Sequence, residues 1–261
     1  MSKFGYEEAF SAEFYDPIYG SSIPDVDFFK DYAKSADGKI LEPACGTGRV
    51  LIPLAQAGYE ITGIDLSKHM LDICRQKLAE QPADIQKRVH LVHANMADFQ
   101  LNEKFALTII PAHSFQILIS QQDQENCLRS IAEHLVSHGR LIVDVFHPHF
   151  PRLFDPQYLQ ERQTRTNITL SDGRNVRVSD RIAAYHKSEQ YNDVEQIYYV
   201  HHPDGREERL VQAFPMHYFF RYEMEYLLRL CGFKVIELFG KYDKSPFTDT
   251  SPEMIFVAEK V

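Results

Sequence analysis

A glycine turn that directly follows a short apolar segment constrains this chain more than any other feature. Residues 39–42 are followed by Pro-Ala-Cys-Gly-Thr-Gly-Arg, and an apolar-periodic stretch, residues 50–57, begins at once. Glycine is needed where the backbone bends tightly and lies against a ligand, because a Cβ would occupy that space. A strand, a glycine turn and a helix in this order point backbone N–H groups and the positive end of the helix toward a nucleotide-like molecule.

An acidic residue closes the next predicted strand and indicates which kind of nucleotide is bound. Residues 60–65 end on Asp65, seventeen positions after Gly48, where a carboxylate can accept hydrogen bonds from both hydroxyls of a ribose. The dinucleotide fingerprint requires a third glycine where Leu51 stands, and the phosphate loop ending G-K-[ST] is absent. A ribose and adenine site without a phosphate cradle suits S-adenosylmethionine.

Strand and helix patterns alternate in the first half of the chain, which predicts a parallel sheet with helices on both faces. The expected helices between strands are residues 68–80, capped by Ser67, and residues 123–136, started by Asp123 or Gln124 and closed by Gly139. Two short helices, residues 6–20 and 25–34, are expected before the sheet. The expected parallel strands are residues 39–42, 60–65, 89–93, 106–110 and 140–144.

After Asp144 the pattern changes to period two with hairpin turns, which predicts an inserted antiparallel sheet of three or four strands. A helix over 222–230 follows, and residues 233–239 and 253–259 are expected to complete the main sheet as an antiparallel hairpin. The expected strands of the inserted sheet are residues 167–170, 175–185, 195–201 and 209–214.

Composition excludes several classes of function. The net charge of −9 argues against nucleic acid as a partner. No apolar run approaches the roughly 20 residues that a membrane span requires, and the N-terminus has no signal pattern, so a cytoplasmic protein without a membrane partner is expected. The four cysteines lie far apart without a C-x-x-C pair, so no metal site is predicted.

These motifs together resemble those of class I S-adenosylmethionine-dependent methyltransferases of the small-molecule type. Their first motif is an acidic residue followed by G-x-G-x-G, and this chain has Glu42, Ala44, Gly46 and Gly48 in those places. Other stretches resemble the lid helix, the ribose turn, the adenine loop, the fifth-strand motif and the tail loop of that family, namely residues 12–19, 63–67, 94–99, 141–148 and 241–247.

The resemblance implies a fold, three regions and a cofactor. The fold is an α/β, Rossmann-like class I methyltransferase sheet with a C-terminal antiparallel hairpin, plus the inserted antiparallel cap. The regions are a helical lid (1–36), a cofactor-binding core (37–150 and 217–261) and a cap over the active site (151–216). Asn95 and Ala97 stand where the family has Asp and Arg. The implied S-adenosyl-L-methionine contacts are Tyr15, Glu42, Ala44, Cys45, Gly46, Gly48, Arg49, Asp65, Leu66, Met70, Asn95, Met96, Ala97 and Pro111.

The candidates for catalysis are His113, His147 and Tyr19. Similar amino-sugar N-methyltransferases carry a catalytic histidine that aligns with Ile117, and His113 would share that face if both lay on one helix. His113 capping the helix or lining the cofactor pocket is the alternative. For His147 the alternatives are a solvated loop or a metal pair with His149 that Asp144 could join. For Tyr19 the alternative is an aromatic face packed on the core.

The candidates for substrate contact are Phe115, His217 and Arg221, the last two beside the final helix, where a simple surface charge is the alternative. The expected activity is methyl transfer to nitrogen or oxygen of a small molecule, mainly by positioning and desolvation. An RNA or protein methyltransferase and a non-enzymatic cofactor-binding module are the rivals. Formation of a homodimer is left open.

Overall fold

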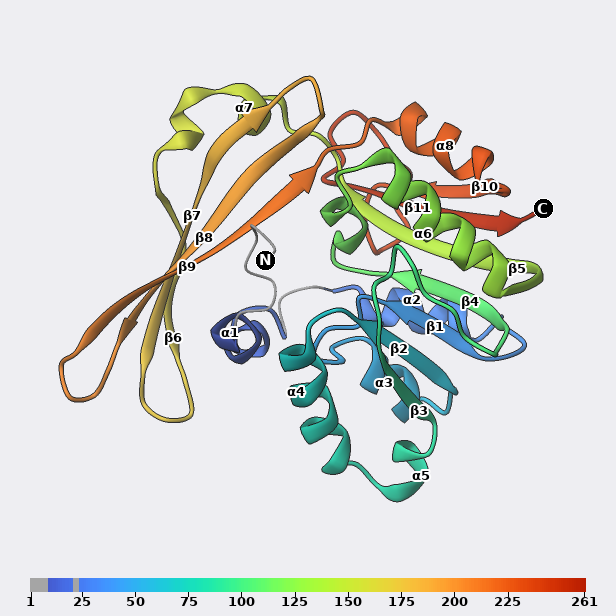
Figure 1. Cartoon of the computed structure of the whole chain (residues 1–261), viewed down its shortest axis with the longest axis horizontal. Coiled ribbons are helices and arrows are strands. Elements are labelled where there is room, and N and C mark those ends of the chain that lie inside the picture. The colour runs from blue at the N-terminus through green and yellow to red at the C-terminus, as the bar shows by residue number, and fades with distance from the viewer. Residues whose placement is uncertain (1–8, 21–23) are drawn as a thin grey trace.

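A seven-stranded sheet forms the centre of the computed structural model, which describes residues 9–20 and 24–261 (Figure 1). The strand order is β10-β11-β5-β4-β1-β2-β3, and every neighbouring pair is parallel except the two pairs that β11 makes. The expected parallel sheet and its antiparallel hairpin are therefore confirmed. The strands are β1 (Ile40–Pro43), β2 (Ile61–Asp65), β3 (Val89–His93), β4 (Phe105–Ile110), β5 (Leu135–Phe146), β10 (Phe233–Phe239) and β11 (Glu253–Lys260).

Helices cover both faces of this sheet, because apolar side chains of the central strands are buried on both sides. One face packs on α2 (Val26–Ala33), α3 (Leu51–Gln56) and α4 (Lys68–Ala79), and the other on α6 (Gln121–His134) and α8 (Arg221–Leu230). Short helical segments complete the chain, namely α5 (Ala83–Gln86), η1 (Ser114–Ile117), α7 (Phe150–Phe154) and η2 (Pro156–Leu159).

The predicted bounds of α6 are wrong at both ends. The helix begins at Gln121 because the Ser120 hydroxyl accepts the Asp123 N–H at 3.1 Å and caps it. It ends at His134 because Leu135 pairs with Phe105 of β4, so the sheet uses an apolar residue that also fits the helical spacing. Gly139 lies inside β5 and closes no helix.

The inserted sheet has four antiparallel strands in the order β6-β7-β8-β9 and stands apart from the central sheet in Figure 1. These strands are longer than predicted. Between β7 and β8 the reason is that the turn over residues 187–190 carries no glycine or proline to reveal it. They are β6 (Arg162–Thr169), β7 (Asn175–His186), β8 (Tyr191–His201) and β9 (Glu207–His217).

Helix α1 (Ala9–Tyr19) lies between the inserted sheet and α4 (Figure 1). Phe14 and Ile18 are buried against apolar side chains of the inserted sheet, among them Tyr198. The other part of the predicted helix over 6–20, residues 6–8, lies outside the described residues. In the described part of the chain, no helix is long and apolar enough to cross a membrane.

Candidate functional site

The glycine turn is fastened to the end of β2 by the Asp65 carboxylate. One carboxylate oxygen accepts the Gly46 N–H at 2.7 Å and the other accepts the Ser67 N–H at 2.7 Å. Burial raises the pKa of Asp65, and these two N–H groups counteract part of that shift. A carboxylate oxygen accepts more than one hydrogen bond, so this fixed group can still receive the hydroxyls of a ribose.

Two glycines serve the turn in different ways. At Gly48, φ is +79° and an added Cβ would lie 2.6 Å from Cys74 Sγ, so a larger residue would clash with the protein itself. At Gly46, φ is +54° and an added Cβ would meet no atom of residues 9–20 and 24–261 within 4 Å, so the backbone borders open space in the described structure. Ala44 also has a positive φ of 57°. The turn is therefore curved so that its backbone faces space in which a ligand can lie.

Three buried ionisable groups lie behind the turn. Arg49 donates to both oxygens of Asp25 at 2.6 Å, and both side chains are buried. Glu42 is 1% exposed, and its Oε2 has no hydrogen-bond partner among the described residues. Burial raises the pKa of Glu42 well above its ordinary value, although Arg49 opposes this. The guanidinium predicted to touch a cofactor is thus held by Asp25, while Glu42 keeps an unpaired oxygen.

Helix α1 ties the turn to the inserted sheet. Asp16 accepts the Thr47 hydroxyl and the Lys77 ammonium, each at 2.6 Å. At the other side of the helix, the hydroxyl of Tyr19 accepts a hydrogen bond from the Gln196 amide, and Arg165 lies over its ring at 4.9 Å. Tyr15 is 5.3 Å from Tyr19 between ring centroids, and burial raises its pKa.

The predicted adenine loop forms a tight turn after β3. The Asn95 side-chain oxygen accepts the Ala97 N–H at 3.0 Å, and one lone pair of that oxygen is left for a ligand. Met96 and Ala97 are buried, whereas Leu66, beside the ribose turn, is 50% exposed. Met70 donates its N–H to the Ser67 cap of α4. Burial raises the pKa of the Cys45 thiol well above its ordinary value, so Cys45 acts as a small packing residue.

The loop after β4 has an unusual backbone. Ala112 and His113 have φ values of 58° and 60°, a left-handed conformation that costs a non-glycine residue about 1–2 kcal/mol. The carboxylate of Asp144, at the end of β5, accepts both of their N–H groups, at 3.1 and 3.0 Å. Tyr242 also donates its hydroxyl to Asp144. A buried carboxylate thus holds the strained pair in place.

His113 lies before η1 and not on a helix, so the expectation that it shares a helical face with Ile117 is wrong. Instead, its Nε2 lies 2.6 Å from Glu253 Oε2 at the start of β11. The side chain of His113 is 30% exposed. Burial lowers the pKa of His113, but the hydrogen bond to Glu253 and the charge of Asp144 outweigh this, so the net pKa is raised.

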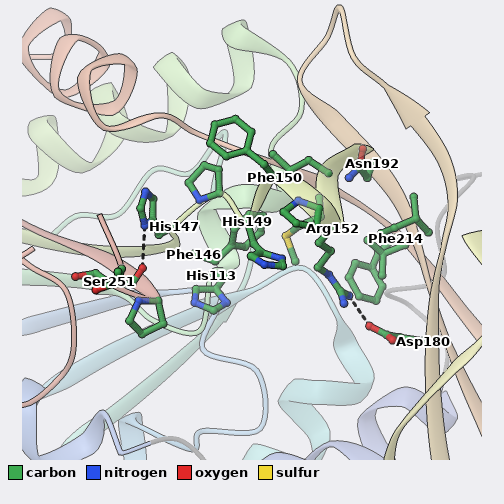
Figure 2. A pocket seen from close by; sticks show the side chains of 18 of the residues that line it. His113, Phe146, His147, His149, Phe150, Arg152, Asp180, Asn192, Phe214 and Ser251 are labelled. Carbon is green, nitrogen blue, oxygen red and sulfur yellow. Dashed lines mark hydrogen bonds and ion pairs between the residues drawn. The ribbon is translucent and has the colours of Figure 1, made fainter. Parts of the chain in front are cut away.

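A cavity of about 890 Å³ lies between this edge of the central sheet and the inserted sheet. Figure 2 shows His113, Phe146 and His149 on one side of this space and Asn192 and Phe214 on the other. Arg152 of α7 reaches across to an ion pair with Asp180 of β7. A smaller cavity of about 500 Å³ is lined by His113, Tyr242 and Glu253 among others.

His147 lines the large cavity, as its candidate role requires. Its Nδ1 lies 2.8 Å from the Ser251 carbonyl oxygen, so Nδ1 donates and Nε2 is the acceptor nitrogen (Figure 2). The metal alternative receives no support from the geometry. No group of three His, Cys, Asp or Glu side chains gathers as a metal ion would need in residues 9–20 and 24–261.

The three residues expected to contact substrate do not line either cavity. Phe115 is fully buried and stacks on Phe219 at 5.5 Å between centroids. His217 is 5% exposed, with Gln116 donating to its carbonyl oxygen. Arg221 is exposed and pairs with Glu225 at 2.8 Å. Pro111 is buried and starts the loop that carries His113.

Comparisons with known proteins agree with this fold. Residues 40–139 match the family described as a methyltransferase domain. A protein of Geobacillus sp. (strain WCH70) that is named as a methyltransferase is 26% identical over 235 residues, 88% of each chain. The dTDP-3-amino-3,6-dideoxy-alpha-D-glucopyranose N,N-dimethyltransferase of Streptomyces fradiae is 31% identical over 120 residues, which is 46% of this chain and 43% of that one. The CcbJ methyltransferase of Streptomyces caelestis superposes with a TM-score of 0.75 at 22% identity, covering 96% of each chain.

Residues 40–139 form a methyltransferase domain, and the whole chain has the fold of class I S-adenosylmethionine-dependent methyltransferases. Its residues fit that cofactor. The methyltransferase has a fixed carboxylate, Asp65, for a ribose, and open space beside the Gly46 backbone. The orphaned oxygen of Glu42 is suited to the ammonium of an amino-acid tail.

Sequence reasoning missed three residues that the methyltransferase brings to this edge of the sheet. Asp144 and Glu253 lie on the neighbouring strands β5 and β11. In the register of these strands, Asp144 lies opposite Ile255 and Glu253 lies opposite Phe146. Tyr242 comes from the loop between β10 and β11. The predicted hairpin offered one signal, because the first residue of its last strand must lie at the carboxyl edge of the parallel strands.

Proposed function

We propose that this methyltransferase transfers a methyl group from S-adenosylmethionine to an amine nitrogen of a small molecule held in the cavity of about 890 Å³. The observation that carries the proposal is the shared lining of that cavity, from the carboxyl edge of the central sheet and from the inserted sheet. Ligands of open α/β sheets bind at this edge. The volume lies in the range of small-molecule sites, and the rival of an RNA substrate is disfavoured by the net charge of −9.

The roles of the residues follow from their geometry. Asp65 accepts the ribose hydroxyls, Glu42 accepts the ammonium of the amino-acid tail, and the free lone pair of Asn95 accepts the adenine amino group. S-adenosylmethionine supplies an electrophilic methyl group when bound. The protein holds the acceptor in line and excludes water, because reaction at a sulfonium needs alignment more than acid or base assistance.

The lid and cap regions proposed for residues 1–36 and 151–216 have a clear task in this reaction. We assign them the task of covering the bound reactants, because α1 contacts both the glycine turn and the inserted sheet and lies between that sheet and α4 (Figure 1). Nitrogen is preferred to oxygen as the acceptor because the relative from Streptomyces fradiae is named for an amino sugar. A cytoplasmic location remains a prediction.

The test is production of S-adenosylhomocysteine with a panel of small amines and their hydroxyl counterparts. We expect turnover with at least one amine and none with the matched alcohol. Met216→Trp, which fills the cavity, should abolish turnover while the affinity for S-adenosylmethionine stays unchanged. Ala213→Trp on the same strand, on a residue outside the cavity lining, is the control. Turnover of alcohols alone, or full activity of Met216→Trp, would contradict the proposal.

A further inference from the structure

We propose that His113 and Glu253 form the pair that accepts the proton from the acceptor amine of this methyltransferase. This inference rests on the proposed function and adds the residues that handle the proton. Neither side chain belongs to the glycine turn, and 140 residues separate them in the sequence. Ile117, which the resemblance aligns with a catalytic histidine of amino-sugar N-methyltransferases, packs against the core.

The backbone under His113 is built to aim its side chain. Two consecutive non-glycine residues, Ala112 and His113, adopt the left-handed conformation, and strain of this kind persists only where surrounding contacts enforce it. Asp144 supplies those contacts through both N–H groups, and Tyr242 donates a hydrogen bond to the same carboxylate. A residue that only filled space would not need this support.

The location of the pair suits a reaction at the methyl-donor site. Strand β4 lies beside β1 in parallel register, with Ile40 opposite Leu107, so the loop that carries His113 leaves the sheet next to the glycine turn. Glu253 opens β11 and lies opposite Phe146 at the end of β5. Because His113 lines the large cavity, its ring can reach a ligand that lies there (Figure 2).

The pairing also selects the nitrogen that takes the proton. Nε2 carries the hydrogen that Glu253 accepts at 2.6 Å, which leaves Nδ1 as the acceptor, and no hydrogen-bond partner for Nδ1 is found among the described residues. In the step, an N–H bond of the acceptor nitrogen breaks and its electron pair stays on that nitrogen. The proton forms a new bond to Nδ1, and the resulting imidazolium is stabilised by the Glu253 carboxylate.

A second cavity gives the proton a way out. His113 lines both cavities, and Glu253 lines the one of about 500 Å³ together with Lys241, Tyr242 and Asp243. Charged and titratable groups surround His113 from several segments of the chain. They are Glu253 on β11, Asp144 on β5, His147 and His149 after β5, Lys241, Tyr242 and Asp243 after β10, Asp249 before β11 and Asp25 before α2, with Arg152 and Asp180 across the large cavity.

The central experiment uses His113→Gly, because glycine adopts a φ of 60° without strain and the loop can keep its shape. We expect kcat with an amine substrate to fall about 100-fold or more at pH 7 and to recover when imidazole is added. Affinity for S-adenosylmethionine should be unchanged. His138→Gln is the control. His138 forms a similar pair at 2.9 Å with Glu259, which lies on β11 as Glu253 does, but His138 is exposed and lies outside both cavities.

The partner carboxylate is tested by Glu253→Gln, with two readouts. In the ligand-free protein, NMR titration should show a lower pKa for the His113 ring than in the wild type, because the stabilising charge is gone. In steady-state kinetics, the acidic limb of kcat should move to lower pH. Glu259→Gln should change neither.

The outcomes separate the two proposals. A wild-type chain that produces no S-adenosylhomocysteine with any amine overturns the proposed function, and the proton-accepting pair with it. The pair alone is overturned if the wild type is active, His113→Gly has a normal kcat, and the acidic limb of kcat in Glu253→Gln does not move. A second pair of results also overturns the proton-accepting pair. In it, imidazole does not restore the activity lost in His113→Gly, and the acidic limb of kcat in Glu253→Gln stays at the wild-type pH.

Discussion

The guanidinium of Arg49 donates one hydrogen bond to each oxygen of Asp25, and both bonds measure 2.6 Å. Arg49 lies at the end of the glycine turn and Asp25 just before α2, so the pair joins the turn to the N-terminal helices. Both side chains are buried, at 6% and 0% exposure.

We expect Asp25→Asn to lower the free energy of unfolding by about 3–5 kcal/mol, because it leaves a buried guanidinium without its counter-charge. Urea unfolding measures this. Asp31→Asn is the control, since its pairs with Lys34 and Lys244 are exposed and should contribute less than about 1 kcal/mol. Equal effects of the two variants would show that the Arg49 pair does not stabilise the fold.

We expect Asp65→Asn to weaken binding of S-adenosylmethionine tenfold or more, since a hydrogen bond to a charged group contributes about 1.5–3 kcal/mol. The amide retains an acceptor oxygen for only one of the two backbone N–H groups, so thermal unfolding of the variant is measured as well, to separate lost ribose contacts from a distorted turn. Titration calorimetry measures the change. Asp72→Asn, on the exposed face of α4, should bind normally; unaltered affinity in Asp65→Asn would remove the ribose assignment.

The two glycines of the turn should respond differently to alanine. Gly48→Ala should destabilise the fold by about 2–4 kcal/mol, because its Cβ would lie 2.6 Å from Cys74 Sγ at a left-handed position. Gly46→Ala should destabilise it by only about 1–2 kcal/mol but should impair cofactor binding, since its methyl group enters the open space.

Thermal unfolding and calorimetry on the same samples separate these effects. Gly232→Ala is the control for Gly46→Ala, because Gly232 has a φ of +86° and open space around its Cβ position. It should show a similar loss of stability and normal affinity. An equal loss of affinity in both would assign the effect to general destabilisation.

We expect Glu42→Gln to stabilise the cofactor-free protein at pH 8 by about 1–3 kcal/mol and to weaken cofactor binding. Burial raises the pKa of Glu42 in the folded state, so the stability that this group contributes is present below its ordinary pKa and is lost as the pH rises through the folded value. The advantage of the variant should therefore grow with pH. The measurement is the free energy of unfolding of the wild type and of Glu42→Gln across the pH range. A constant difference between the two proteins would contradict this prediction.

Local patterns made most of the fold predictable. The glycine turn, the strand that ends on Asp65 and the period-two segments after Asp144 each depend on a few neighbouring residues. The end of α6 could not be found in this way, because Leu135 satisfies both the helical spacing and the pairing with Phe105. Only the completed sheet decides between them.

The candidate site divides in the same manner. Asp65 and Gly46 were predictable because one strand and one turn place them together. The contact between His113 and Glu253 was not, since it depends on β11 entering the sheet next to β5. Phe115 and Arg221 are close in sequence to residues of the site but do not line the cavities. Phe115 packs on Phe219, and Arg221 lies on the exposed face of α8.

Helix α1 has one further consequence. Its Asp16 is attached to the glycine turn and α4, and its Phe14 and Tyr19 are attached to the inserted sheet. These contacts make the 11 residues of α1 a mechanical link between the two parts. We therefore expect a movement of the inserted sheet to be transmitted to the glycine turn, so that departure of the spent donor and exchange of the methylated product are coupled.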